Sequence, residues 1–80
     1  MNTKQAVALR ITDLCKERGI AVNTLANTAG IPPSTLYSII GEKSKSPEII
    51  TIKKICDGFG ISLAQFFNTE IFNQLEQEIK

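Results

Sequence analysis

Three hydroxyl-bearing side chains lie at helical spacing near the middle of the chain. Ser34 and Ser38 are four residues apart, and Tyr37 lies three residues after Ser34, so a helix would place all three on one face. Their hydroxyls can each donate and accept a hydrogen bond, and the tyrosine ring can pack against a methyl group. In the major groove of DNA each base pair presents its own pattern of donors, acceptors and methyls, so this face is suited to contact base edges. Residues 33–40 contain no Arg, Asn or Gln, which excludes bidentate recognition of guanine or adenine from this segment.

A central helical hairpin is predicted to position these hydroxyls. Two short helices are expected over residues 22–29 and 33–40, and Gly30 closes the turn because a left-handed backbone is cheap only for glycine. Pro33 fits the first position of the second helix, where its missing N–H would have no partner anyway. Ala26 is small enough to let the second helix approach closely. In such a hairpin one helix braces while the other lies in the major groove of DNA.

The rest of the chain is predicted to be helical as well. Apolar residues recur with helical periodicity over four further segments, which end at glycines or begin at polar capping residues. The expected helices run from Thr3 to Arg18, from Glu48 to Phe59, from about Ser62 to Phe67, and from Asn68 or Thr69 to Glu78. The expected buried stripe of the Glu48–Phe59 helix consists of Ile49, Ile52, Ile55, Cys56 and Phe59.

Length and composition limit what the chain can do. Eighty residues form one domain with a small core, which leaves no room for a fused sensor or catalytic domain. No stretch approaches the roughly 20 apolar residues that span a membrane. No apolar signal-peptide core follows residues 1–6, so we expect a cytoplasmic protein without a membrane partner.

Cys15 and Cys56 are the two cysteines, and the chain has no histidine. This excludes the usual zinc sites and a Ser-His or Cys-His catalytic pair, and we expect no cofactor, no metal site and no small-molecule ligand. Each cysteine lies on the apolar side of an expected helix, where a small buried side chain is favoured over redox chemistry. Asp13, Glu17 and Glu48 are scattered and form no catalytic pattern, so an enzyme is a distant alternative.

Charge is distributed unevenly along the chain. Residues 1–54 hold eight Lys or Arg and four Asp or Glu, a net charge of +4, whereas residues 55–80 hold one and four, a net charge of −3. We therefore expect a nucleic-acid contact in the first part and an interaction surface in the second.

A series of motifs, in this order and at this spacing, resembles one known family. The matching positions are Leu25-Ala26, Ala29-Gly30-Ile31, Ser34-Thr35-Leu36, Ile39, Lys43, Pro47, Ile52, Ile55 and Phe59-Gly60-Ile61-Ser62. Over about residues 7–67 the chain resembles the Cro/CI family of helix-turn-helix regulators, which has the lambda-repressor-like fold and is also called the xenobiotic-response-element family. It is most similar to the short single-domain regulators of bacterial chromosomes, phages and mobile elements.

The resemblance implies a fold and a function. It implies an all-α, compact five-helix lambda-repressor-like DNA-binding domain over residues 1–67, to which residues 68–80 add a C-terminal helical extension. Members of the family bind a short, often pseudo-palindromic operator in double-stranded DNA, usually as a homodimer, and residues 33–40 would be the recognition helix. We therefore expect a sequence-specific transcriptional regulator, a repressor that occupies promoter DNA.

The DNA contacts implied by position in the family form two sets. The expected base-edge residues are Pro33, Ser34, Tyr37 and Ser38. The expected phosphate contacts are Asn23, Thr24, Thr35, Lys43 and Lys45. Asn23 or Thr24 would stand in for the glutamine that many members carry at the start of the first hairpin helix, where this chain has Val22.

Several of these assignments compete with simpler ones. Ser34 and Thr35 lie in the first turn of their helix, where capping is an equally good use of a hydroxyl. The apolar stripe of the last expected helix would either form the dimer contact, together with Ile50, or fold back on the chain's own core. That stripe consists of Ile71, Phe72, Leu75 and Ile79. The same fold could also serve as a protein–protein interaction module, such as an antitoxin or an antagonist of another regulator, which the acidic C-terminal segment favours.

Overall fold

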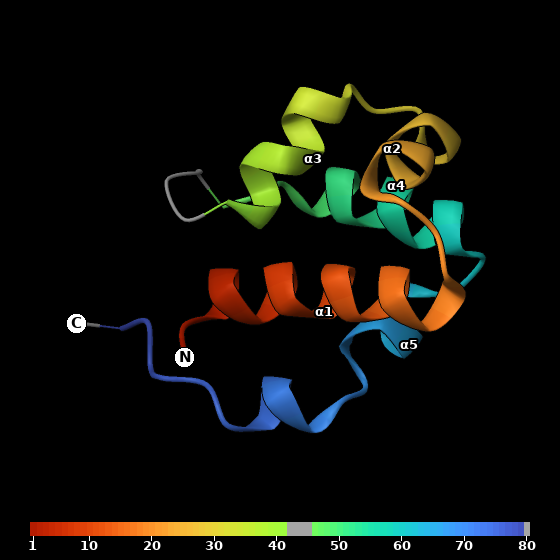
Figure 1. Ribbon diagram of the computed structural model, residues 1–80. Helices are drawn as coiled ribbons and strands as arrows, with labels where there is room; N and C mark the ends of the chain where they lie inside the picture. The colour runs from red at the N-terminus through yellow and green to blue at the C-terminus, as the bar shows by residue number, and fades with distance from the viewer. Residues whose placement is uncertain (42–45, 80) are drawn as a thin grey trace.

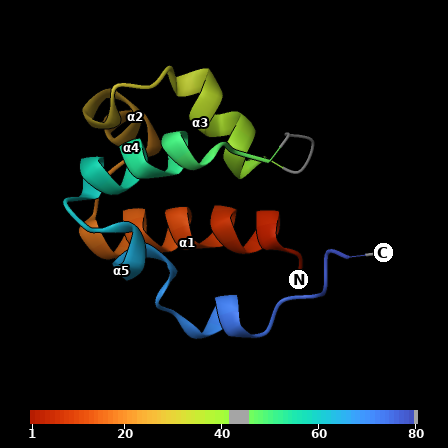
Figure 2. The same cartoon turned by 180° about the vertical axis from the view of Figure 1, so that it is seen from behind.

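The helix that opens the chain also runs through the middle of the molecule. The computed structural model describes residues 1–41 and 46–79, which contain helices and no strand. The elements are α1 (Thr3–Arg18), α2 (Val22–Ala29), α3 (Pro33–Ile40), α4 (Ile49–Phe59), α5 (Leu63–Phe67) and a 3₁₀ turn, η1 (Glu70–Asn73). Figures 1 and 2 show α2, α3 and α4 on one side of α1, and α5 with η1 on the other. The predicted all-α fold is confirmed, and the predicted bounds of the first three helices agree with those observed.

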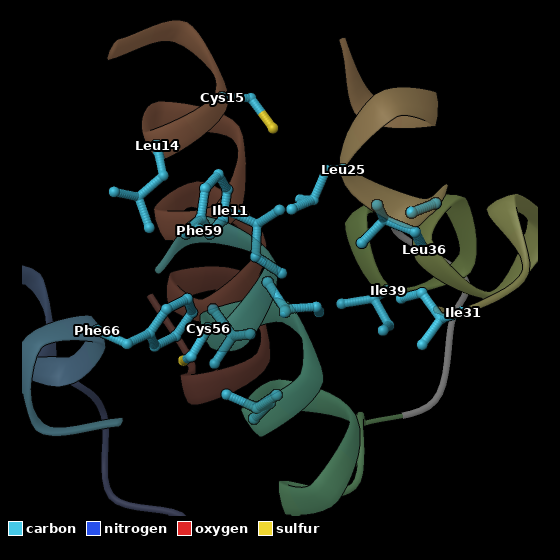
Figure 3. Close-up of a cluster of buried hydrophobic side chains, with 14 residues drawn as sticks. Ile11, Leu14, Cys15, Leu25, Ile31, Leu36, Ile39, Cys56, Phe59 and Phe66 are labelled. Carbon is cyan, nitrogen blue, oxygen red and sulfur yellow. The ribbon is translucent and has the colours of Figure 1, made fainter. Parts of the chain in front are cut away.

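The core is formed by the inward stripes of the five α-helices (Figure 3). The largest fully buried side chains are Phe66, Ile11, Leu25, Leu36, Ile55 and Cys56. They come from all five helices, so each helix depends on the others for the burial of its apolar face. This shared core fixes the orientation of α3, because Leu36 is completely buried and Ile39 nearly so.

Both cysteines belong to this core and are free thiols, as predicted. Burial raises the pKa of the Cys15 thiol, because desolvation disfavours the thiolate. Burial also raises the pKa of the Cys56 thiol, and the positive charge of nearby Lys53 offsets part of that effect. The thiols therefore act as small apolar side chains in the packed interior.

A glycine inside α4 allows α2 to pack closely against it. A Cβ atom on Gly58 would lie 3.3 Å from the Ala29 Cβ atom and 3.3 Å from a Leu25 methyl group. Since α2 is the bracing helix of the hairpin, this close approach sets how the hairpin sits on the rest of the domain. Gly30 closes the hairpin turn with a left-handed backbone, φ 72°, as predicted.

Two arginines of α1 bind the C-terminal ends of other helices. Arg10 donates from Nε to the Phe66 carbonyl at 2.8 Å and from Nη2 to the Gln65 carbonyl at 3.0 Å, both in α5. Arg18 donates from Nη1 to the carbonyl of Phe59, the last residue of α4, at 2.6 Å. Each guanidinium also lies over the ring of the same phenylalanine, at 5.9 and 5.8 Å from the ring centroid. The positive charges thus face the negative ends of two helix dipoles.

Lys4 makes a similar contact at the end of α3. Its ammonium donates from Nζ to the carbonyl of Gly41 at 2.8 Å, in a partly buried position. Gly41 is the C-cap, as predicted, but its φ of −74° and ψ of 157° are extended rather than left-handed. The C-terminal end of α3 is therefore attached to the first turn of α1.

The predicted C-terminal helix from Asn68 or Thr69 to Glu78 is wrong. The chain forms only the four-residue turn η1 over Glu70–Asn73, and residues 75–79 have no regular secondary structure. The reason lies partly in aromatic packing, because the Phe72 ring stacks edge-on against Phe67 at 4.9 Å and lies 6.1 Å from the Phe66 ring. This packing holds η1 against α5.

The last residues then run back to the start of α1, which a continuous helix would not reach. The Glu76 amide donates to the Met1 carbonyl at 3.2 Å. Glu78 accepts hydrogen bonds on Oε2 from both the amide and the hydroxyl of Thr3, at 3.0 Å each. A carboxylate at the positive end of the α1 dipole is favourable, so the tail is stabilised in this extended path.

One expected core position of α4 is also wrong. Ile49 was predicted to lie in the buried stripe, but its side chain is 55% exposed. It is the first residue of the helix, since Glu48 is the N-cap, and the core begins three residues later at Ile52. Ile50 lies off the stripe, as predicted, and is 63% exposed.

Candidate nucleic-acid interface

The outward face of α3 presents the predicted base-edge residues together. Pro33, Ser34, Tyr37 and Ser38 are all exposed. Tyr37 is 52% exposed, whereas its neighbour Leu36 is completely buried. The inward anchoring of α3 therefore turns its hydroxyl-bearing side to solvent, which is the orientation that a recognition helix requires.

The hydroxyls of Ser34 and Thr35 do not cap α3. The N-cap is Pro32, which has no side-chain acceptor, and its carbonyl accepts from the amides of Thr35 at 3.0 Å and Leu36 at 3.3 Å. The first turn is thus closed by backbone bonds alone. The capping alternative does not hold, and both exposed hydroxyls lie at the surface of the first turn.

The N-termini of the helices differ in how they are capped. In α1 and α5, Asn2 and Ser62 accept from the amide of the third helical residue, and that residue's glutamine side chain accepts from the cap amide. In α2, α3 and α4 the N-cap residues are Ala21, Pro32 and Glu48, and none of these three side chains makes a capping bond. First-turn amides without a side-chain cap are suited to bind an anion, such as a DNA phosphate. The start of α3 offers fewer of them than the start of α2, because Pro33 has no N–H and the Thr35 amide donates to the Pro32 carbonyl.

The predicted phosphate residues lie partly on this uncapped surface. Asn23 and Thr24 are exposed in the first turn of α2, and Thr35 is exposed in the first turn of α3. Lys43 and Lys45 fall outside the residues that the structure describes, so their contacts stay predictions. The described members of the set come from the two helices of the hairpin.

The positive charge of residues 1–54 is only partly available to DNA. Three of its cations, Lys4, Arg10 and Arg18, bind helix C-termini inside the domain. Lys53 pairs with Asp57 one turn along α4. Sequence reasoning missed these internal roles, although a signal existed. Lys4, Arg10 and Arg18, three of the four cations of α1, each lie three or four residues from a buried residue of that helix.

The C-terminal segment does not cover the outward face of α3. In both ribbon views α5, η1 and the tail lie on the opposite side of α1 from α3. The predicted recognition surface is therefore open within the described part of the chain.

The predicted dimer-contact residues are placed unevenly. Phe72 packs on the aromatic rings of its own chain, which corresponds to the alternative that the stripe folds back. Ile71 and Leu75 are partly buried, and Ile79 is 86% exposed. The four residues do not form one helical stripe, because the helix that would align them is absent from the described residues.

Two further features are absent from residues 1–41 and 46–79. No helix there combines the length and apolar character needed to cross a membrane. Within the same residues, no group of three or more His, Cys, Asp or Glu side chains is placed to hold a metal ion.

Similarity to known proteins agrees with this geometry. The Cro/C1-type HTH DNA-binding domain matches residues 10–70. The crystal structure of the prophage Lp1 protein 11 has a TM-score of 0.81 to this fold at 32% sequence identity, and the match covers 94% of this chain and 100% of that one. No curated protein is significantly similar. The match takes in the hairpin, the helices that brace it and the turn that follows them, and the chain therefore belongs to the Cro/C1-type helix-turn-helix DNA-binding domain family.

Proposed function

We propose that the protein is a sequence-specific regulator of transcription, a cytoplasmic repressor that occupies promoter DNA and reads its major groove with α3. The observation that carries this proposal is the outward face of α3, where exposed hydroxyls lie beside first turns without side-chain caps. Membership of a DNA-binding family supports the choice of double-stranded DNA as the partner. Repression by occupancy requires binding alone, and no chemical step is proposed.

Base recognition is assigned to the exposed positions of α3. The hydroxyls of Ser34 and Ser38 would donate to or accept from base edges, and the Tyr37 ring would pack against a thymine methyl. Pro33 would lie closest to the DNA at the start of the helix. Since α3 carries no Arg, Asn or Gln, we expect modest intrinsic specificity, supplemented by water-mediated contacts and DNA shape.

Phosphate contacts are assigned to the start of the hairpin and to the segment that follows α3. Asn23 and Thr24 lie in the first turn of α2, which has no side-chain cap, and Thr35 lies in the first turn of α3. Lys43 and Lys45 would supply positive charge. Changing both lysines to alanine is expected to weaken binding to all DNA sequences and to flatten its salt dependence. Unchanged affinity and an unchanged salt slope would contradict their assignment.

We propose a homodimer as the unit that binds an operator. A single α3 offers few contacts, and two copies about 34 Å apart would meet successive turns of the major groove. The tail stripe is the proposed contact. Phe72 packs on its own chain, so the exposed surfaces of Ile71, Leu75 and Ile79 would carry most of this contact.

The deciding experiment selects bound sequences from a random pool of DNA duplexes. Enrichment of a short, pseudo-palindromic motif is the expected outcome. Tyr37→Ala and Ser38→Ala would then be measured on the selected site and on variants of it, where they should change the preference among sites. An equal loss of affinity for every sequence would contradict the base-reading role.

A second candidate function, a protein–protein interaction module such as an antitoxin or a regulator antagonist, is favoured by Ile49 and Ile50. These adjacent side chains are 55% and 63% exposed, an apolar pair on the surface of α4. A mobility shift with random duplex at low salt separates the two functions. Binding at micromolar protein supports the DNA-binding regulator, and its absence supports the interaction module.

A further inference from the structure

We infer that Lys4 is a positioning residue for DNA binding, which acts by holding the C-terminal end of the recognition helix rather than by contacting DNA. This inference rests on the proposed function of α3. Lys4 lies in the first turn of α1 and donates from Nζ to the Gly41 carbonyl, 37 residues away in sequence, at 2.8 Å. This bond joins α1 to the end of α3, and Figure 1 shows the two ends on the same side of the molecule.

The end of α3 lacks the geometry that closes most other helices of this chain. The C-caps of α1, α2 and α4 are glycines with left-handed backbones, φ 62°, 72° and 74°. Gly41 is extended instead, and its amide donates to the Tyr37 carbonyl at 2.9 Å. The chain therefore leaves α3 directly, and the Lys4 ammonium opposes the negative end of the α3 dipole at that point.

The turn that carries Lys4 is itself held from two sides. Asn2 and Gln5 form a reciprocal capping box across it, with bonds of 2.8 and 2.9 Å. Glu78, from the opposite end of the chain, accepts from the Thr3 amide and hydroxyl. Because the residues on both sides of Lys4 are bonded, its ammonium is presented to Gly41 from a rigid base.

The bond between Lys4 and Gly41 lies close to two of the residues proposed to contact bases. Tyr37 and Ser38 lie in the last turn of α3, within four residues of Gly41. Leu36, Ile39 and Ile40 anchor the inward face of the helix through their side chains, whereas Lys4 binds the backbone carbonyl of its C-cap. Loss of the Lys4 bond would let the end of α3 shift, and the outward side chains would no longer meet base edges in register.

The experiment measures the affinity for the selected DNA site as a function of salt concentration. Lys4→Met keeps the aliphatic stem and removes the donor, and it should weaken binding by about fivefold with the salt slope unchanged. Lys4→Arg keeps a charged donor and should restore affinity to within about twofold of the wild type. Lys16→Met is the matched control, because it removes the same charge from an exposed position of the same helix. Its affinity should stay within about twofold of the wild type.

A salt slope that falls by about 0.9 in Lys4→Met would mean that Lys4 contacts a phosphate, and the inference would be wrong. Equal effects of Lys4→Met and Lys16→Met, or failure of Lys4→Arg to restore affinity, would also overturn it. Thermal denaturation of each variant ensures that binding is measured on folded protein, and Lys4→Gln replaces Lys4→Met if the latter does not fold.

The amide NMR spectrum of the protein without DNA separates this inference from the proposed function. In Lys4→Met the amide signals of Tyr37, Ser38 and Gly41 should shift, whereas in Lys16→Met they should not. Unshifted signals in Lys4→Met would refute the inference whatever the DNA result. Failure of the wild type to bind any duplex, with these signals shifted in the variant, would refute the proposed function instead.

Discussion

α1 and α5 begin with reciprocal hydrogen bonds between a cap side chain and the third helical residue, whereas the N-cap side chains of α2, α3 and α4 make no capping bond. A good N-cap contributes about 1 kcal/mol to stability, so this difference has a cost. The two capped helices lie outside the hairpin, and the uncapped ones are α4 and the two helices of the hairpin proposed to bind DNA. In α1 and α5 the side chains at the helix start bind first-turn amides of the same helix. In the hairpin no N-cap side chain does so, and its first-turn side chains stay exposed on the face proposed to meet DNA.

The cations show the same division. Arg10 and Arg18 donate hydrogen bonds to carbonyls at the ends of α5 and α4. Their guanidinium groups also lie over phenylalanine rings, so both side chains are part of the packing. Lys16 and Lys54 are exposed on α1 and α4 and bind no helix end among the described residues. Net charge by sequence segment therefore overstates the positive charge that DNA would meet.

The strongest test of the comparison uses two adjacent residues of α3. Leu36→Ala removes a completely buried side chain and should lower the free energy of unfolding by about 2–5 kcal/mol. Tyr37→Ala removes a half-exposed ring and should change it by no more than about 0.5 kcal/mol. Urea denaturation measures both. Similar losses would mean that Tyr37 belongs to the packed interior and that α3 has no free face.

The junction between α2 and α4 gives the next largest effect. Gly58→Val would place a branched side chain against Ala29 and Leu25, where even a Cβ atom has only 3.3 Å. The free energy of unfolding should fall by about 1–3 kcal/mol, because the two helices must separate. Thermal or urea denaturation measures this. A variant as stable as the wild type would show that the hairpin is not held by this contact.

Alanine substitutions of two serines test the difference between a capped helix and an uncapped one. The Ser62 hydroxyl caps α5 and accepts from the Gln65 amide at 3.0 Å. Ser62→Ala removes this bond and should lower the free energy of unfolding by about 1 kcal/mol. Ser34→Ala, in the first turn of α3, should cost less than about 0.5 kcal/mol. The order should reverse for DNA: Ser34→Ala should reduce affinity or change site preference, and Ser62→Ala should not. Equal stability losses would contradict the division between the two groups of helices.

Adding the missing cap to α2 tests the cost of leaving it open. Ala21→Asp should stabilise the protein by about 0.5–1 kcal/mol, because a carboxylate caps the first turn and faces the positive end of the dipole. The same carboxylate should repel a phosphate and weaken DNA binding. Ala21→Asn is the matched control, which caps without charge. If Ala21→Asp binds DNA as tightly as the wild type, the start of α2 does not face a phosphate.

The smallest expected effect comes from the buried thiols. Burial raises the pKa of Cys15 and Cys56, so the unfolded chain releases these protons at lower pH than the folded protein does. The stabilisation is present below the unfolded thiol pKa, about 8.5, and is lost as the pH rises from there through the folded values. Denaturation between pH 8 and about 9.5 should show this decline, which the double variant Cys15→Ala, Cys56→Ala should lack. An identical pH profile in both would contradict thiol burial.

Local signals in the sequence were sufficient for much of the fold. The bounds of α1, α2 and α3, the left-handed turn at Gly30 and the exposure of Tyr37 followed from apolar spacing and from glycine and proline positions. Features that depend on distant contacts did not. The tail after η1 pairs with the start of α1, a contact between the two ends of the chain, so helical periodicity alone misjudged it. The internal use of Lys4 and Arg10 depends likewise on partners at the ends of other helices.

The placement of the candidate site residues was predicted to a similar extent. The shared outward face of α3 followed from the i, i+3, i+4 spacing of its hydroxyls, and the structure brings those residues together. Ala21 and Pro32 have no side-chain acceptor, so the sequence indicates that α2 and α3 lack side-chain caps. The contrast with α1 and α5 depends on hydrogen bonds that the structure shows.

The half-exposed ring of Tyr37 has a practical consequence, since the chain contains one tyrosine and no tryptophan. Excitation near 280 nm therefore probes a single fluorophore, and that fluorophore lies on the exposed face of α3. Its emission reports on whatever covers that surface, without an introduced label and without a signal from the rest of the domain.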